Sequence, residues 1–97
     1  MKSSGRLCRG ELVQVLAGHD KREYFLVLSV QKPYVFLCDG KRRKVNHLKK
    51  KKEKHVISTG LICGWIDTEP ERVNNTSVRR AIRDLLRKQE TEFASGR

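Results

Sequence analysis

The residues with the clearest chemical potential are a dense group of lysines and arginines in the middle of the chain. Between residues 41 and 55 there are nine basic residues and one acid, Glu53, which gives a local charge of +8 out of the net +11. Such a block repels itself, so we expect it to be flexible until a polyanion such as a nucleic-acid backbone neutralises it. A solvated run or a localisation tract is the alternative. The candidate phosphate-binding residues here are Lys41, Arg42, Arg43, Lys44, Lys49, Lys50, Lys51, Lys52 and Lys54.

Two further groups of basic residues give weaker signals. Lys21 and Arg22 follow a turn-like cluster after the first predicted strand, and they could reach phosphates or form an ordinary charged turn. The basic residues near the C-terminus are more simply the solvent face of an amphipathic helix. These are Arg79, Arg80, Arg83, Arg87 and Lys88.

The sequence contains no constellation typical of an enzyme. It has no nucleophile–base pair, no paired carboxylates, no phosphate-binding glycine loop and no metal-ligand cluster. Cys8, Cys38 and Cys63 are an odd set, 30 and 25 residues apart, with no CxxC pair and no His at ligand spacing. We therefore predict free thiols, no catalytic residues, no metal, no cofactor and no small-molecule substrate.

Composition limits the class of protein. The chain has 97 residues, 37% of them apolar and 34% charged, with a mean hydropathy of −0.64 and a pI near 10.1. Its apolar runs fall far short of the ~18 residues that span a bilayer, and no signal-peptide stretch follows the charged residues 1–6. The balance favours a cytoplasmic protein with a polyanionic partner, nucleic acid before an anionic membrane surface.

The first half of the chain has the alternation of short strands. The strongest signal runs from Glu23 to Val30, and Asp39-Gly40 predicts a two-residue hairpin turn. Strands this short and numerous are best accommodated in a mainly β, small SH3-like barrel, since a flat sheet would leave both faces and both edges open. The expected strands are Glu11–Ala17, Glu23–Val30, Tyr34–Cys38, Lys41–Val45 and Lys54–Ser58.

The C-terminal segment has helical periodicity. Val78, Ile82, Leu85 and Leu86 lie on one stripe, preceded by candidate N-caps in residues 74–77. We expect this amphipathic helix to pack on the outside of the barrel. Its stripe contains no Trp, which argues against a membrane-surface role.

The predicted organisation has five parts. Residues 1–9 form an N-terminal extension, and 10–59 form the barrel with its basic hairpin and lysine run. Residues 60–75, which contain Trp65, form a linker or docking segment. The helix covers 76–93, and 94–97 form a frayed tail.

Residues 10–57 resemble a known family. The run from Gly10 to Lys21 resembles the KOW motif of ribosomal proteins and transcription elongation factors: a glycine, alternating valines, then Gly18, Asp20 and Lys21. Together with residues 24–28, 38–45 and 49–55, the pattern is similar to large-subunit ribosomal proteins of the fourteen-e and twenty-seven-e group. It is closest to the short bacterial KOW-domain RNA-binding proteins related to them. One departure is that Arg22 and Glu23 follow Lys21 where many KOW sequences carry Gly, which leaves the loop conformation open.

The resemblance implies an SH3-like barrel that binds rRNA at or near the large ribosomal subunit. It assigns Gly18, Asp20 and Lys21 to the motif loop, and the basic hairpin begins at Asp39 and Gly40. The two glycines are expected to provide backbone geometry rather than contacts. Tyr24 and Tyr34 could stack on unpaired bases, but filling the barrel or its rim is the simpler role. The basic-hairpin residues implied by the resemblance are Asp39, Gly40, Lys41, Arg43 and Lys44.

A different class of function competes with RNA binding. Similar barrels bind protein partners in transcription and translation complexes, and the C-terminal helix or Trp65 could form a protein-docking face. The location of the charge distinguishes the two functions. Replacing Lys49–Lys52 with serine should abolish RNA binding and leave a protein–protein contact intact.

Overall fold

Alternating apolar residues build one antiparallel sheet of five short strands. The computed structural model describes residues 7–95 of the chain, with side chains as far as residue 89. The strand order is β4-β3-β2-β1-β5. The strands are β1 (Glu11–Val15), β2 (Tyr24–Gln31), β3 (Tyr34–Cys38), β4 (Lys49–Lys52) and β5 (Val56–Ile62). The helical elements are the 3-10 turns η1 (Glu53–His55) and η2 (Pro70–Arg72), the short α1 (Trp65–Thr68) and the long α2 (Asn75–Ser95).

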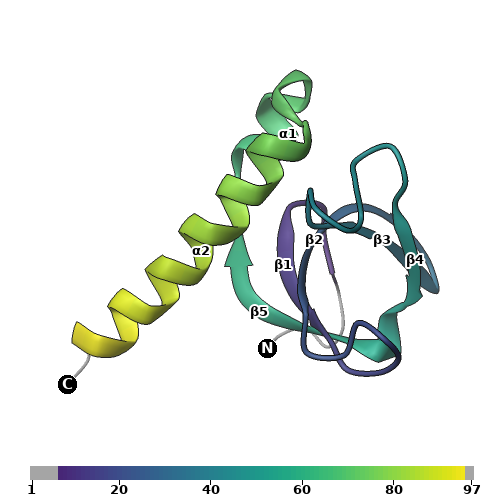
Figure 1. The fold of residues 1–97 in the computed structure, drawn as a ribbon, viewed down its shortest axis with the longest axis horizontal. Helices are drawn as coiled ribbons and strands as arrows, with labels where there is room; N and C mark the ends of the chain where they lie inside the picture. The colour runs from purple at the N-terminus through teal and green to yellow at the C-terminus, as the bar shows by residue number, and fades with distance from the viewer. Residues whose placement is uncertain (1–6, 96–97) are drawn as a thin grey trace.

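The sheet curls because β2 serves two partners. Its first residues pair with β1 and its remainder pairs with β3, with a register shift between Val27 and Ser29 that bends the strand. Figure 1 shows the resulting curl, with β4 and β5 brought round to opposite sides and joined through η1. The predicted mainly β class with a C-terminal helix is confirmed, and the curled sheet has the shape expected of a small SH3-like barrel.

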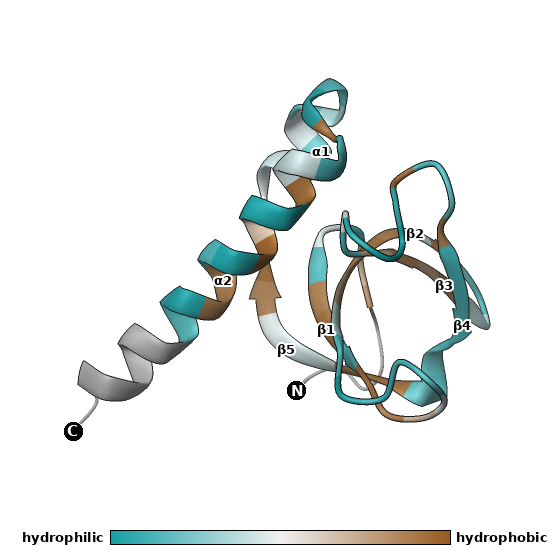
Figure 2. Ribbon diagram, viewed as in Figure 1, coloured by the Kyte–Doolittle hydropathy of each residue, from teal (hydrophilic) through white to brown (hydrophobic). Residues whose placement is uncertain are grey.

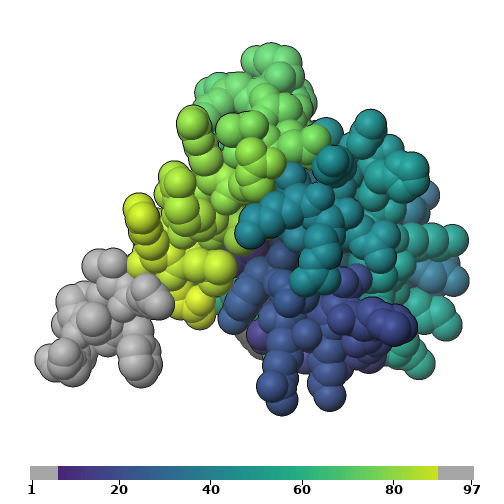
Figure 3. All heavy atoms as spheres, in the orientation of Figure 1, coloured from purple at the N-terminus to yellow at the C-terminus, as the bar shows by residue number. Residues whose placement is uncertain are grey.

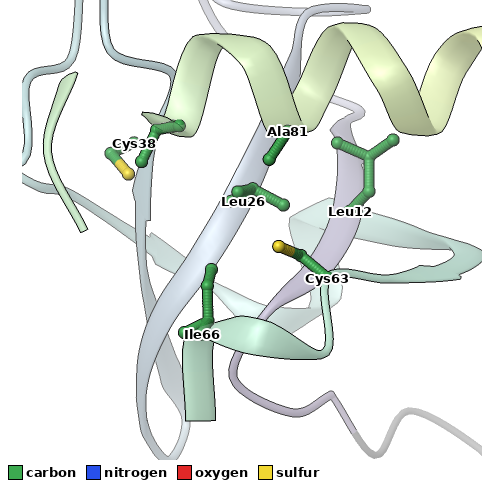
Figure 4. Close-up of a cluster of buried hydrophobic side chains, with 7 residues drawn as sticks. Leu12, Leu26, Cys38, Cys63, Ile66 and Ala81 are labelled. Atoms are coloured by element: carbon green, nitrogen blue, oxygen red, sulfur yellow. The ribbon is translucent and has the colours of Figure 1, made fainter. Parts of the chain in front are cut away.

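Both faces of the sheet are apolar, and each has its own core. Side chains alternate across a strand, so neighbours in β2 such as Phe25 and Leu26 enter different cores. Figure 2 shows the apolar strands in brown and the polar β4 in teal. The inner core is built from Val13, Val15, Phe25, Val27, Val35, Leu37 and Val56. The outer core is built from Leu12, Leu26, Cys38, Cys63, Ile66, Val78 and Ala81 (Figure 4).

The C-terminal helix covers the outer core, as its apolar stripe predicts. Val78 and Ala81 of α2 are buried against it, and α2 lies on β2 and β5. Asn74 caps the helix: the Ser77 N–H donates to its Oδ1 at 2.8 Å, and the Asn74 N–H donates to Ser77 Oγ at 2.9 Å. The helix therefore begins at Asn75, one residue before the prediction, and still continues at residues 94 and 95.

Other boundaries also differ from the prediction: β1 ends at Val15 rather than Ala17, and β5 begins at Val56 rather than Lys54. The barrel was expected to end at residue 59, but β5 continues to Ile62, because its far end pairs with Glu11. The segment 60–75 therefore contains the end of a strand as well as α1 and η2, and buried Ile66 of α1 fixes it to the outer core. Of the expected N-terminal extension, residues 1–6 lie outside the described residues, as do 96 and 97 of the tail.

The expected strand at Lys41–Val45 is wrong. After β3 the chain forms a loop, because the Asp39 carboxylate accepts hydrogen bonds from the Lys41 and Arg43 N–H groups, both at 2.9 Å. The Asp39 N–H in turn donates to the Arg43 carbonyl at 3.0 Å. These bonds satisfy the backbone locally, so the returning strand starts only at Lys49.

The three cysteines are free thiols in this fold. Cys38 and Cys63 are buried in the outer core and Cys8 is exposed. Burial raises the pKa of the Cys38 thiol to about 12, and the neighbouring Asp39 charge adds to the shift. Within residues 7–95, no helix is long and apolar enough to cross a membrane.

Candidate nucleic-acid interface

Buried Asp20 organises the basic segment. It lies in the loop between β1 and β2, and only 4% of its surface is exposed. Lys49 Nζ lies 3.1 Å from Oδ2, Arg42 Nη1 lies 3.4 Å from Oδ1, and Arg43 Nη2 lies 3.6 Å from Oδ2. Lys49 compensates the charge on Oδ2 as an ion pair. Three residues predicted to bind phosphate therefore converge on one carboxylate.

The electrostatics of this cluster leave it positively charged. Burial favours the neutral form of Asp20, but the close Lys49 ammonium and the charges of Arg43 and Arg42 outweigh it. The pKa of Asp20 is consequently lowered. Asp20 contributes one negative charge and its three partners contribute three positive charges, so a net charge of +2 remains. Glu23 offsets part of this excess, because its Oε2 lies 3.4 Å from Arg42 Nη2.

The loop of residues 39–45 is also anchored on its other side, by α2. Arg79 Nη1 donates to the Gly40 carbonyl at 2.9 Å, and the Val45 N–H donates to Asn75 Oδ1 at 2.8 Å. Gly40 has a φ of +79°, and a Cβ there would collide with the Asn75 carbonyl oxygen. The glycine thus allows both the turn and the close approach to the helix, as the predicted geometric role requires. Figure 3 shows the teal spheres of this connection against the green spheres of α2.

The lysine run is a strand, which contradicts the expectation of a flexible segment. In the register of β3 and β4, Lys49 and Lys51 lie opposite Leu37 and Val35, which fill the inner core. Paired residues share a face, so these two lysines point inward, toward the β1–β2 loop. Lys49 reaches Asp20, and Lys51 Nζ donates to the Ala17 carbonyl at 2.9 Å. Two of the four lysines of β4 therefore make contacts within the protein itself.

The other two lysines of β4 face outward. Lys50 and Lys52 are exposed, and Lys50 Nζ lies 4.3 Å from the centroid of the Tyr34 ring. Tyr34 is partly covered by this cation–π contact, while Tyr24 packs against the outer core. Tyr24 thus takes the packing role that was the simpler prediction, whereas Tyr34 is part of neither core.

The motif loop between β1 and β2 keeps two left-handed residues. Gly18 has a φ of +92°, in agreement with its expected role. Arg22 has a φ of +75°, which is uncommon for a residue with a side chain. Its N–H donates to the Val15 carbonyl at 2.7 Å, and its carbonyl accepts from Gln14 Nε2 at 3.1 Å. The backbone at Arg22 is thus held in a conformation that glycine adopts more readily, and the side chains of Lys21 and Arg22 are exposed.

The remaining three residues that were predicted to bind phosphate lie in two different places. Lys41 and Lys44 are exposed in the anchored loop beside Arg42 and Arg43. Lys54 is exposed in η1, beyond the opposite end of β4, and is not part of that group.

Sequence reasoning missed a second basic group. Lys41, Arg79, Arg80 and Arg83 line a cleft of about 400 Å³ between the loop and α2. These arginines could extend the basic surface, but an amphipathic helix alone predicts an ordinary charged solvent face for them. A signal existed in their spacing: Arg79, Arg80 and Arg87 are all three or four residues from Arg83, and like charges at that spacing destabilise a helix.

No model of a known protein family matches the chain, and no curated protein matches it significantly. Among the described residues, no group of three or more His, Cys, Asp or Glu side chains gathers closely enough to hold a metal ion.

Proposed function

We propose that this chain is a non-enzymatic, cytoplasmic RNA-binding protein that contacts the phosphate backbone through its anchored basic loop and β4. By the KOW resemblance, the RNA is rRNA, at or near the large ribosomal subunit. The observation that carries the proposal is the convergence of Arg42, Arg43 and Lys49 on buried Asp20. The single carboxylate of Asp20 holds three cationic side chains in place and neutralises only one of their charges, so the cluster stays positively charged.

Fixed cations bind a polyanion better than mobile ones. Arg42 remains 62% exposed, so its guanidinium can hold Asp20 and still contact a phosphate. Less side-chain entropy is lost on binding when the geometry is already set. The exposed Lys41, Lys44, Lys50 and Lys52 extend the same positive region.

The mechanism has a direct test in the salt dependence of binding. The apparent affinity for a structured RNA is measured by fluorescence anisotropy between about 50 and about 300 mM salt. If about six phosphates are neutralised, log K falls against log salt with a slope of roughly −4 to −5. A flat response over this range would overturn phosphate recognition.

The cellular target is tested by sedimentation of a tagged copy in sucrose gradients of lysate, at low and high salt, with and without nuclease. Co-migration with large-subunit particles that is lost at high salt supports rRNA binding. A protein that stays at the top of the gradient at low salt contradicts the ribosomal assignment.

A protein-interaction module is the second candidate, and one observation favours it. Ile57 and Ile62 of β5 are each 52% exposed, and Leu16, which follows β1, is 46% exposed, so large apolar side chains are available to a partner. The described part of the helix stripe does not support this candidate, because Val78, Ala81 and Ile82 pack on the protein's own sheet. Replacing Ile57 and Ile62 with Ser should abolish a protein contact and leave RNA affinity unchanged.

A further inference from the structure

A stacked pair of side chains stands beside the basic cleft. The Arg72 Cζ lies 4.3 Å from the centroid of the Trp65 ring, so the guanidinium lies over the indole at the junction of α1 and η2. Glu69 Oε1 holds Arg72 Nη1 at 3.1 Å. The Arg72 side chain is nevertheless 51% exposed. A guanidinium plane held in this way is a surface on which a nucleic-acid base can stack.

This pair lines a cavity of about 720 Å³ whose other walls are polar. Asn74, Asn75 and Asp84 contribute amide and carboxylate groups to it. Asn75 Oδ1 is already bound to the Val45 N–H, which leaves the amide nitrogen as a donor for another group. A flat stacking surface with donors and acceptors around it matches the edge and face of a base. Its volume lies within the usual range of ligand pockets.

The cavity lies next to the basic cleft and shares two lining residues with it. Thr76 and Arg80 line both of them. Arg80 thus lines the basic cleft together with three other cations, and it lines the cavity together with the Trp65–Arg72 stack. A nucleotide needs both kinds of surface, because its phosphate requires cations and its base requires a flat group on which to stack. An acidic peptide would use the cations but would have no need of the stack.

We propose that the junction of α1, η2 and α2 binds one unpaired nucleotide of RNA, with its phosphate in the basic cleft and its base stacked on Arg72. This inference rests on the proposed function and deepens it. The anchored loop and β4 supply affinity for any phosphate backbone, whereas this site selects RNA that offers an unstacked base in a loop, bulge or end.

The test uses intrinsic fluorescence, because Trp65 is the only tryptophan of the chain. Three probes are titrated into the full-length protein: an RNA hairpin with an unpaired loop, a blunt RNA duplex with the same number of phosphates, and inorganic polyphosphate. The hairpin is expected to change the Trp65 emission saturably and to bind at least about fivefold more tightly than the duplex, the lower end of the effect of stacking one base. The duplex and polyphosphate are expected to leave the emission unchanged.

A charge-conserving variant isolates the stack. Arg72→Lys keeps the net charge and removes the planar group, so it should lower hairpin affinity to that of the duplex and leave duplex affinity unchanged. Arg87→Lys is the matched control, because Arg87 is exposed on α2 and lines neither cavity. Thermal melting by circular dichroism shows whether each variant folds, and the probe comparison on the unmodified protein does not depend on either variant.

The outcomes separate the two proposals. Equal affinity for hairpin and duplex with no change in emission overturns the nucleotide site and leaves backbone binding intact. An emission change with polyphosphate equal to that with the hairpin also overturns it, since no base is then involved. Failure of both RNAs to bind overturns the proposed function and this site together.

Discussion

The two basic segments of the molecule hold their charges in different ways. In the segment from the end of β3 through β4, cations converge on buried Asp20, and the Asp39 carboxylate accepts hydrogen bonds from the backbone of the loop. On α2, Arg80 and Arg83 lie exposed on a regular helix, and the only described ion pair of this stripe joins Arg83 Nε to its neighbour Asp84 at 3.3 Å. The two segments therefore differ in how strongly the position of each charge is constrained.

The difference shows what a single buried acid can do. An exposed pair such as Arg83–Asp84 contributes little, because water and salt screen it. Asp20, in contrast, fixes the positions of three side chains, two from the loop after β3 and one from β4. The charges of these three side chains in turn favour the ionised form of Asp20. The cations around Asp20 thus form a rigid template of charge, whereas Arg80 and Arg83 of α2 are exposed side chains with no such anchor. Arg79 of α2 is instead held by its hydrogen bond to the Gly40 carbonyl.

Removing the charge of Asp20 is expected to have the largest effect. Asp20→Asn leaves three cations facing one another around a neutral amide. We expect the free energy of unfolding to fall by about 2 kcal/mol, less than for a fully buried pair because the partners are partly exposed. Urea denaturation measures the change. Asp67→Asn is the control, since Asp67 belongs to an exposed pair with Arg9 at 3.6 Å and should matter little. Equal stability of the two variants would contradict the template.

The same aspartate predicts a pH dependence. Because the pKa of Asp20 in the folded protein is lower than its ordinary value of 3.8, its contribution to stability is fully present above that value. The contribution is lost as the pH falls through the lowered pKa. Stability of the natural protein should therefore fall more steeply below pH 3.8 than that of Asp20→Asn. Parallel curves for the two proteins would show that Asp20 titrates normally.

Within β4, two double variants with identical change in charge should behave differently. Lys49→Ser with Lys51→Ser removes the inward contacts, and should lower the free energy of unfolding by about 1–2 kcal/mol. Lys50→Ser with Lys52→Ser should change it by less than about 0.5 kcal/mol. The outward pair should instead reduce the salt slope of RNA binding by about 1.5. Denaturation and anisotropy on both variants give the comparison, and indistinguishable variants would mean that the alternation of the strand has no consequence.

The fourth prediction concerns backbone strain in the loop between β1 and β2. Arg22→Gly places the residue that prefers positive φ at the left-handed position, and should raise the free energy of unfolding by about 0.5–1 kcal/mol. Lys21→Gly is the control, because a glycine there gains nothing and loosens the unfolded chain. Thermal melting of both variants is the measurement. A less stable Arg22→Gly would indicate that the arginine side chain stabilises the loop.

The smallest effect is expected on α2. Arg83→Gln removes repulsion from three neighbouring arginines, and should raise the free energy of unfolding by about 0.3 kcal/mol. The same change should weaken RNA binding, because Arg83 lines the cleft. Stability and affinity would then move in opposite directions. A variant that binds RNA as well as the natural protein would remove α2 from the interface.

Elements governed by local pattern could be predicted from the sequence. The alternation in Tyr34–Cys38 gave the bounds of β3, and the cap and stripe from Asn74 onward gave α2 to within a residue at its start. The two apolar faces of β2 also indicated an outer layer, which α2 supplies.

The rest depends on contacts distant in sequence. Lysine has a low preference for strands, so nothing local marks Lys49–Lys52 as β4, and pairing with β3 overrides the preference. Asp20 is 22 residues from Arg42, and no spacing rule connects them. Asp39-Gly40 did mark a turn, but the Asp39 carboxylate closes a wider loop than a two-residue hairpin. The neighbours of Arg72 and Trp65 likewise became visible only in three dimensions.

The position of β4 in the sheet has one more consequence. Within the described residues β4 is the outermost strand and pairs only with β3, which leaves one side of its backbone available to a strand from another molecule. A row of lysines on such an edge opposes that pairing, since a second copy would bring its own positive row alongside. We therefore expect little self-association through β4 while its charge is uncompensated. RNA that neutralises the row would lift this protection, so copies crowded on one RNA are expected to meet along this edge first.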